Sequence, residues 1–272
     1  MAIIWIDGVR YGQTDESGKM TITSIMPGSH SIRVRKAGFK ETSRPLLQTQ
    51  KGNVEVPLTK TLDEAELVFQ QAESIAASDR EKAIEAYKKA VKLRPKYLDA
   101  YIGLARIYSD SGNFEMALGA VREARNARPG YAEASAIEGR VFNSSGNAAK
   151  AVASFKRAIS EGKGFQPEAY TGLGLIYKDR AEVAAGNAEY EQESKDYAEA
   201  AKYFTTAVKQ LSGSPDGLVV YQFLGLVYEQ QKKYKEAIAV YEMFLQLFPD
   251  SPESTAVRSF IVQLTKQMNE PK

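Results

Sequence analysis

The 272-residue sequence contains no cysteine, one histidine and one tryptophan. Without cysteine, disulfide bonds, thiolate metal sites and cysteine nucleophiles are excluded. The single histidine, His30, has no evident nucleophile or orienting partner, so we interpret it as a surface residue at a strand start, not as a general base or metal ligand. The sequence therefore predicts no catalytic, cofactor or metal site, and we expect a protein that is not an enzyme.

Long apolar runs and concentrated charge are also missing. No run reaches the roughly 18 apolar residues that a membrane-spanning helix needs, and the formal net charge is only +2. The first 62 residues carry nine Lys or Arg and five Asp or Glu, a balance that does not predict nucleic-acid binding. Ala2–Ile6 is too short for a signal-peptide core, so we expect any export signal or anchor to lie upstream of this chain.

Before residue 60, apolar residues alternate with polar ones. Ile32 and Val34 follow this period of two, as do the apolar positions within 20–25 and 54–58. Such alternation predicts half-buried strands. Short strands with frequent turns predict a small antiparallel β-sandwich over residues 1–60. Pro57 cannot donate a ladder hydrogen bond, which places its strand at an edge.

After residue 62 the pattern is helical and repeats. Ala83, Ala117 and Ala151 follow one another at intervals of 34 residues, and Pro95 and Pro129 are spaced in the same way. A fixed period of this length predicts stacked helical hairpins, each packed against its neighbours.

The clearest unit combines Tyr101, Leu104, Ala105 and Tyr108 on one helix face with Phe114, Ala117, Val121 and Ala124 on the next helix, separated by Gly112-Asn113. These residues resemble the tetratricopeptide repeat (TPR) family. The resemblance extends over five hairpins, at about 64–97, 98–131, 132–166, 167–214 and 218–251, and implies a superhelical solenoid over 63–250. In the first unit, Gln70 and Gln71 stand where the family has Leu-Gly, and a loop one residue shorter, which places Ala72 at the helix crossing, fits better. A capping helix is expected over 252–269.

Residues 1–60 resemble a PEGA-type domain. The matching segments are Ile6-Asp7-Gly8, Ile25-Met26-Pro27-Gly28, and Ala37-Gly38-Phe39. The tetrapeptide Pro-Glu-Gly-Ala itself is not present. The resemblance implies an extracytoplasmic or envelope protein of bacteria or archaea. We therefore expect a periplasmic or envelope-associated protein, with a cytoplasmic location as the alternative.

The TPR resemblance implies that the first helix of each hairpin lines a concave groove. Carried over to this sequence, the groove residues are Phe69, Ile102, Arg106, Ile137, Arg140, Thr171, Leu175, Lys178, Gln222, Phe223, Leu226 and Glu229. Arg106, Arg140 and Lys178 form a predicted basic stripe among apolar patches. Such a surface suits an extended or helical peptide with acidic and apolar residues. The alternative interpretation is a solvated face without a ligand.

The fourth unit carries an insertion. Tyr177 and Tyr197 are 20 residues apart, whereas Tyr108 and Phe114 in the second unit are 6 apart. The additional residues correspond to about two extra turns on each helix, which predicts a hairpin projecting around 179–196. It is either a binding feature or a neutral expansion.

These observations lead us to expect a small β-sandwich followed by an all-α solenoid, acting as a non-catalytic scaffold that binds a protein or peptide, in assembly or organisation at a bacterial cell envelope. Three alternatives stay open. The chain is the scaffold or sensor part of a larger signalling protein, it self-associates through exposed solenoid surface, or its β domain binds glycan or peptidoglycan. Trp5 is interpreted as a core residue rather than a sugar platform.

Overall fold

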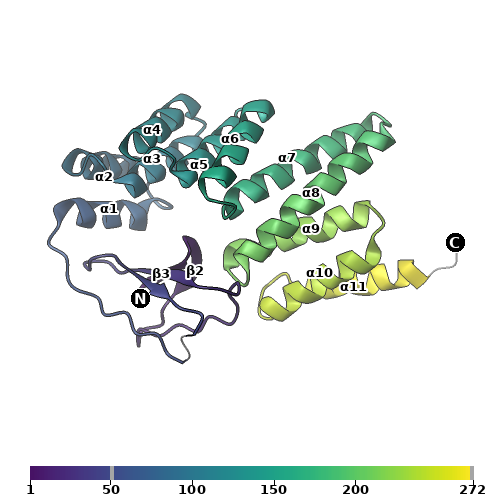
Figure 1. The fold of residues 1–272 in the computed structure, drawn as a ribbon, viewed down its shortest axis with the longest axis horizontal. Coiled ribbons are helices and arrows are strands. Elements are labelled where there is room, and N and C mark those ends of the chain that lie inside the picture. The colour runs from purple at the N-terminus through teal and green to yellow at the C-terminus, as the bar shows by residue number, and fades with distance from the viewer. Residues whose placement is uncertain (50–51, 270–272) are drawn as a thin grey trace. The chain divides into compact units, whose positions relative to one another are not determined.

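The structure is a computed structural model that describes residues 1–49 and 52–269. Four strands at the N-terminus are followed by eleven α-helices and one 3-10 turn within these residues (Figure 1). A small antiparallel β unit followed by an all-α solenoid is thus confirmed as the fold class.

The four strands form a single sheet in the order β2-β1-β3-β4. They are β1 (Ile3–Ile6), β2 (Val9–Gln13), β3 (His30–Arg35) and β4 (Thr42–Leu46). Strand β3 is antiparallel to both β1 and β4. Edge strand β4 contains Pro45, which stands opposite Ser31, in keeping with the confinement of proline to sheet edges.

The sheet is simpler than the alternation predicts. Residues 20–25 and 54–58 form no regular strand, and the latter are followed by an isolated bridge between Phe39 and Lys60. Within the described residues there is accordingly one sheet, not two packed face to face. Period two alone therefore does not show whether a segment joins a ladder.

The helices form five antiparallel pairs and one final helix. They are α1 (Glu64–Ile75), α2 (Arg80–Leu93), α3 (Leu98–Asp110), α4 (Phe114–Ala127), α5 (Ala132–Ser144), α6 (Ala148–Glu161), α7 (Pro167–Gly186), α8 (Tyr190–Leu211), α9 (Leu218–Gln230), α10 (Tyr234–Leu247) and α11 (Ser254–Asn269), with the 3-10 turn η1 (Pro215–Gly217) before α9. Helices α7 and α8 have 20 and 22 residues, against 13 and 14 in α3 and α4, because residues 179–196 lengthen both.

Glycines on the first helix of a pair allow aromatic rings to pack against the backbone. A Cβ placed on Gly139 would lie 2.5 Å from the ring of Phe155, and one on Gly174 would lie 2.5 Å from Phe204. Gly225 stands in the same relation to Tyr241. The Gly172-Leu173-Gly174 segment therefore owes its Gly174 to helix packing and not to phosphate binding.

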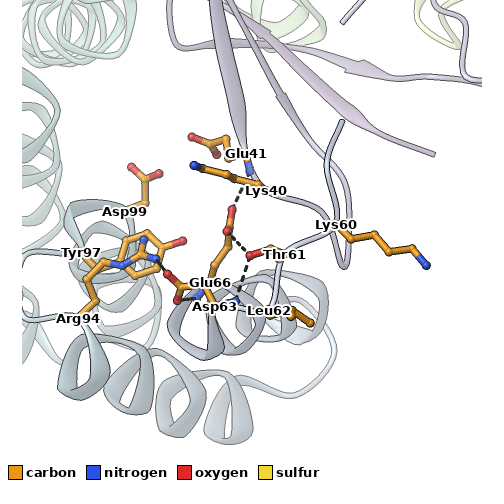
Figure 2. A pocket seen from close by; sticks show the side chains of 10 residues that line it. All are labelled: Lys40, Glu41, Lys60, Thr61, Leu62, Asp63, Glu66, Arg94, Tyr97 and Asp99. Carbon is orange, nitrogen blue, oxygen red and sulfur yellow. Dashed lines mark hydrogen bonds and ion pairs between the residues drawn. The ribbon is translucent and has the colours of Figure 1, made fainter. Parts of the chain in front are cut away.

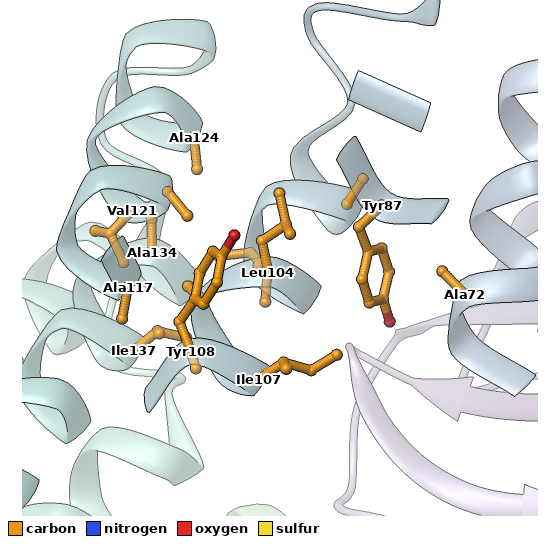
Figure 3. Packing of buried hydrophobic residues seen from close by; sticks show 14 of the residues in the cluster. Ala72, Tyr87, Leu104, Ile107, Tyr108, Ala117, Val121, Ala124, Ala134 and Ile137 are labelled. Carbon is orange, nitrogen blue, oxygen red and sulfur yellow. The ribbon is translucent and has the colours of Figure 1, made fainter. Parts of the chain in front are cut away.

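Small and large side chains alternate in the core of the first repeats (Figure 3). Ala72, Ala105 and Ala117 are fully buried, which lets the helix backbones approach closely. Tyr87 and Tyr108 are large members of the same buried cluster. The predicted core of the helical repeats is thus the observed one.

Helix ends follow from local sequence. Asp63 and Asp79 accept hydrogen bonds from Glu66 N–H and Lys82 N–H and so cap α1 and α2. Gly112 ends the α3 turn with φ 74°, a left-handed conformation that glycine adopts without a steric cost. Lys232 occupies the corresponding place after α9 with φ 56°, where a side chain is unfavourable.

The chain divides into two compact units. The first comprises Met1–Gly8, Gln13–Lys19 and Gly28–Ala169, and the second comprises Val9–Gly12, Met20–Pro27 and Tyr170–Lys272.

Candidate partner-binding surfaces

The first unit contains a polar surface on α1 and α3 that is covered by the β sheet. We name it the α1/α3 surface and define it by Glu66, Phe69, Gln70 and Glu73 of α1 and Asp99 of α3. It contacts β3 and the turn that follows it. Glu66 and Gln70 are buried although both are polar, so each needs hydrogen-bond partners within the protein.

Arg35 of β3 is the centre of this contact. Its guanidinium lies 3.3 Å from Glu73 Oε2, 3.1 Å from Asp99 Oδ2 and 2.5 Å from Glu41 Oε2. Burial acts to lower the pKa of Arg35, but the negative charges of Glu41, Asp99 and Glu73 outweigh burial and raise that pKa. A buried cation with three carboxylates is fully compensated.

Two aromatic rings complete the environment of Arg35. Its guanidinium carbon lies 4.6 Å from the centre of the Phe69 ring and 5.0 Å from that of Trp5. Arg33 lies over Trp5 at 4.6 Å and within 3.3 Å of Asp99. Desolvated contacts of this kind contribute about 2 kcal/mol or more each. Trp5 is buried, as the core interpretation of this residue predicts.

The turn after β3 is held by hydrogen bonds from α1. Gly38 N–H donates to Gln70 Oε1 at 2.8 Å, and the Gln70 amide donates to Phe39 O at 2.8 Å. Glu41 N–H donates to Glu66 Oε1 at 2.7 Å. Gln70 thus forms hydrogen bonds with two backbone groups of the β unit. A hydrophobic residue at this position could not form either of them.

A polar pocket of about 450 Å³ borders this surface (Figure 2). Its lining includes Glu41, Glu66, Asp99, Arg94 and Tyr97. The carboxylates already have internal partners, since Glu66 accepts from Thr61 and Asp99 pairs with arginines of β3. Lys60 points away from the other labelled side chains.

The other predicted groove residues of the first unit are buried or paired. Phe69, Ile102 and Ile137 are exposed by only 1%, 4% and 0%. Arg106 pairs with Glu168 at 2.8 Å and Glu133 at 3.4 Å, and Arg140 pairs with Asp110 at 2.6 Å. Burial acts to lower the pKa of Arg106, but these two glutamates together raise it.

The predicted groove residues of the second unit are more accessible. Thr171, Leu175 and Lys178 of α7 and Gln222, Phe223 and Glu229 of α9 are half-buried, and Leu226 is 36% exposed. Phe223 packs against Phe204 with ring centres 5.7 Å apart, and Glu229 accepts from the Tyr241 hydroxyl at 2.5 Å. Lys178 lies 2.8 Å from Glu182.

All three members of the predicted basic stripe therefore have carboxylate partners. The stripe offers little uncompensated positive charge to an acidic partner. Whether the twelve predicted residues bind a partner stays a prediction, but only the α7 and α9 members combine apolar character with exposure.

Two further polar contacts lie outside the predicted groove, and the first of them differs from what the sequence indicates. His30 is not a surface residue, because its side chain is 7% exposed and its Nδ1 lies 2.6 Å from Asp7 Oδ2. Asp7 also accepts from Ser31 N–H, so this pair fixes the β1–β2 turn to β3. Glu138, unusual for a family position that is normally apolar, accepts from Ser154 and pairs with Arg157 and Arg125.

In the second unit, N-terminal segments contact the loop between α8 and α9. The Tyr11 hydroxyl donates to Ser212 O at 3.0 Å, and Ser214 Oγ donates to Arg10 O at 2.7 Å. No group of three or more metal-ligating side chains gathers among the residues that the structure describes. None of the helices within residues 1–49 and 52–269 is long and apolar enough to cross a membrane.

Consecutive antiparallel helix pairs, with a glycine–aromatic contact in several of them, define a helical-repeat solenoid of the protein-interaction class. Sequence comparison assigns the family: one tetratricopeptide-repeat model matches residues 74–141 and a second matches 179–250. Together these ranges cover just over half of the chain. The helical part of the chain therefore belongs to the tetratricopeptide-repeat family, whose members act as protein-interaction scaffolds.

Solved structures agree on the fold. Yeast Tom70 matches at TM-score 0.60 and 17% identity, covering 76% of this chain and 41% of its own. The Cut9 and Hcn1 hetero-tetramer of APC/C matches at 0.56 and 18%, covering 77% and 38%. PilF of Pseudomonas aeruginosa matches at 0.54 and 16%, covering 75% and 90%. No curated protein sequence matches the chain.

Proposed function

We propose that this chain is a non-catalytic scaffold that binds a protein or peptide partner on the inner face of its solenoid, at α7 and α9. The observation that carries the proposal is the contrast in access among the predicted groove residues. Those on α1, α3 and α5 are buried or ion-paired, whereas Leu175, Phe223 and Leu226 leave apolar surface open.

The chemistry of this face favours an apolar anchor in the partner. Leu226 and Phe223 supply apolar area, and Gln222 supplies an amide that both donates and accepts hydrogen bonds. Lys178 is paired with Glu182, so charge is a minor contribution. A partner helix or extended segment with apolar residues at regular spacing fits this face. Since the helices are preformed, binding has a small ordering cost on the scaffold side.

A capture experiment tests the proposal. Wild type is compared with Leu175→Asp combined with Leu226→Asp, using cell extracts fractionated into envelope and cytosol. The matched control is Met243→Asp with Val262→Asp, two exposed apolar residues of α10 and α11 in the same unit. Circular dichroism first establishes that all three chains fold.

We expect one partner to be retained by wild type and by the control but lost from the Leu175 and Leu226 variant. Retention by all three chains would contradict binding at α7 and α9. Loss from both variants would point to general apolar adhesion and would equally contradict the proposal.

For location, we propose the periplasm or cell envelope of a bacterium. The support is the resemblance of residues 1–60 to PEGA-type domains, and the β unit is then a second contact module or a spacer. Fractionation of cells that produce the native protein tests this, and recovery in the cytosol alone would contradict it.

A further inference from the structure

We infer that the α1/α3 surface is a binding site for a strand with arginines at alternate positions, and that β3 of this chain is its built-in ligand. The site is distinct from the α7 and α9 face, and the inference holds whether or not that face binds a partner.

The contact has the composition of a recognition site and not of an ordinary core. Arg35, Glu66 and Gln70 are all buried, and each has partners on the opposite side of the contact. Apolar packing alone would be enough to hold together two elements of one chain. Burying polar side chains, in contrast, costs free energy unless each of them is hydrogen-bonded or ion-paired. The polar groups therefore specify which strand is accepted.

The strand register explains why alternate arginines are needed. Arg33 stands opposite Trp5 in β1, and Arg35 stands opposite Ile3. Residues two apart lie on the same face of a strand, so both guanidinium groups meet Asp99, at 3.3 and 3.1 Å. Glu73 takes a second contact from Arg35. A lysine strand lacks the planar fork and the stacking on Trp5 and Phe69.

The site also selects its ligand by backbone contacts. Gln70 binds one N–H and one carbonyl of the turn at Gly38 and Phe39, and Glu66 binds the N–H of Glu41. A ligand must therefore combine alternate arginines with a turn directly after the strand.

If the site is a true binding site, a second copy can supply the ligand. Two full-length variants test this by complementation. The first, Arg33→Glu with Arg35→Glu, keeps the acidic site but loses the strand that fills it. The second, Glu73→Gln with Asp99→Asn, keeps the arginine strand but loses the acids, while the amide oxygen introduced at position 73 can still accept from the Tyr87 hydroxyl. Lys19→Glu with Arg44→Glu is the control, because it reverses two charges of the N-terminal segment that take no part in the contact.

Light scattering reports the mass of each variant and of their mixtures. We expect each variant alone to be monomeric and the two together to form a 1:1 complex, at least roughly tenfold tighter than any self-association. Wild type and the control have filled sites and should not join either variant. The inference would be overturned if the two variants formed no mixed complex, or if either variant bound wild type as tightly as it binds the other variant.

Folding is checked by circular dichroism before mixing. If charge reversal prevents folding, Arg33→Gln with Arg35→Gln replaces it, since it empties the site without repulsion. For this replacement, we expect the same 1:1 complex with the second variant, and its absence would again overturn the inference.

Discussion

The inner faces of α1 and α3 and of α7 and α9 arise from one repeat pattern but present different chemistry. On α1, Glu73 accepts from the Tyr87 hydroxyl and also pairs with Arg35. On α9, Glu229 accepts from the Tyr241 hydroxyl, and nearby Leu226 stays exposed. The same tyrosine–glutamate contact thus supports an occupied face in one case and an open face in the other.

The difference lies in a few positions outside the core. Gly139 and Gly174 serve the same packing purpose in the two units, so the scaffold is shared. Gln70, Glu66 and Asp99 adapt one face to the β unit, while leucine and phenylalanine leave the other apolar. A solenoid can therefore assign its faces to different ligands with little change to its core.

The largest expected effect comes from removing the cation at the centre of the occupied face. Arg35→Ala leaves three carboxylates without their shared partner and exposes the rings of Trp5 and Phe69. We expect a loss of about 3 kcal/mol in the free energy of unfolding, measured by urea denaturation. Arg258→Ala on α11, an exposed position, should change that free energy by less than about 0.5 kcal/mol. An equal loss of free energy of unfolding in the two variants would contradict a central role of Arg35 in this contact.

A second prediction tests whether both faces rest on the same core. Gly139→Ala and Gly174→Ala each place a methyl group within 2.5 Å of a phenylalanine ring. We expect each to destabilise its unit by about 2 kcal/mol, seen as a lower thermal midpoint. Gly119→Ala on α4 is the control, because its nearest neighbour is 3.9 Å away. Helix propensity should then make that variant up to about 1 kcal/mol more stable.

Removing the tyrosine hydroxyl measures how much each of the two tyrosine–glutamate hydrogen bonds contributes to stability. Tyr87→Phe and Tyr241→Phe each remove a hydrogen bond to a carboxylate and should cost about 1.5 kcal/mol. The buried Tyr108 hydroxyl has no hydrogen-bond partner among the described residues, and Phe142 stands 34 positions later. Tyr108→Phe should be neutral or stabilising in chemical denaturation, and a loss equal to that of Tyr87→Phe would be inconsistent with this interpretation.

The smallest effect concerns the turn after α9. Lys232 has φ 56° where Gly112 has φ 74° after α3. Lys232→Gly should stabilise the chain by about 1 kcal/mol because glycine adopts this conformation freely. The reciprocal change, Gly112→Lys, should destabilise it by a similar amount. A rise in the thermal midpoint for the first variant and a fall for the second are the expected results.

The helical repeats were predictable because their periodicity records packing directly. Ala83, Ala117 and Ala151 recur at positions where helix backbones meet, and all three are fully buried. The β unit was less predictable. Residues 54–58 alternate like a strand, but strand pairing depends on contacts distant in sequence that a local pattern does not contain.

The candidate surfaces were predictable only in part. Family position predicted which residues line the groove, but it did not reveal that Arg106 and Arg140 pair with carboxylates of other helices. Glu182, the partner of Lys178, lies four residues further along the same helix. Gln70 and Gln71 stand where the 34-residue spacing expects Leu-Gly, and Gln70 is the one of the two that contacts the β unit. Departures from a repeat are therefore informative about intramolecular contacts.

Amide hydrogen exchange at Gly38 and Glu41 measures whether β3 and the turn that follows it are bound to the α1/α3 surface. Both N–H groups donate to side chains of α1. We predict slow exchange in wild type and fast exchange in Arg33→Glu with Arg35→Glu, while the Ala117 amide of α4 stays protected in both. Fast exchange at Gly38 and Glu41 in wild type, or no change in the variant, would contradict the account.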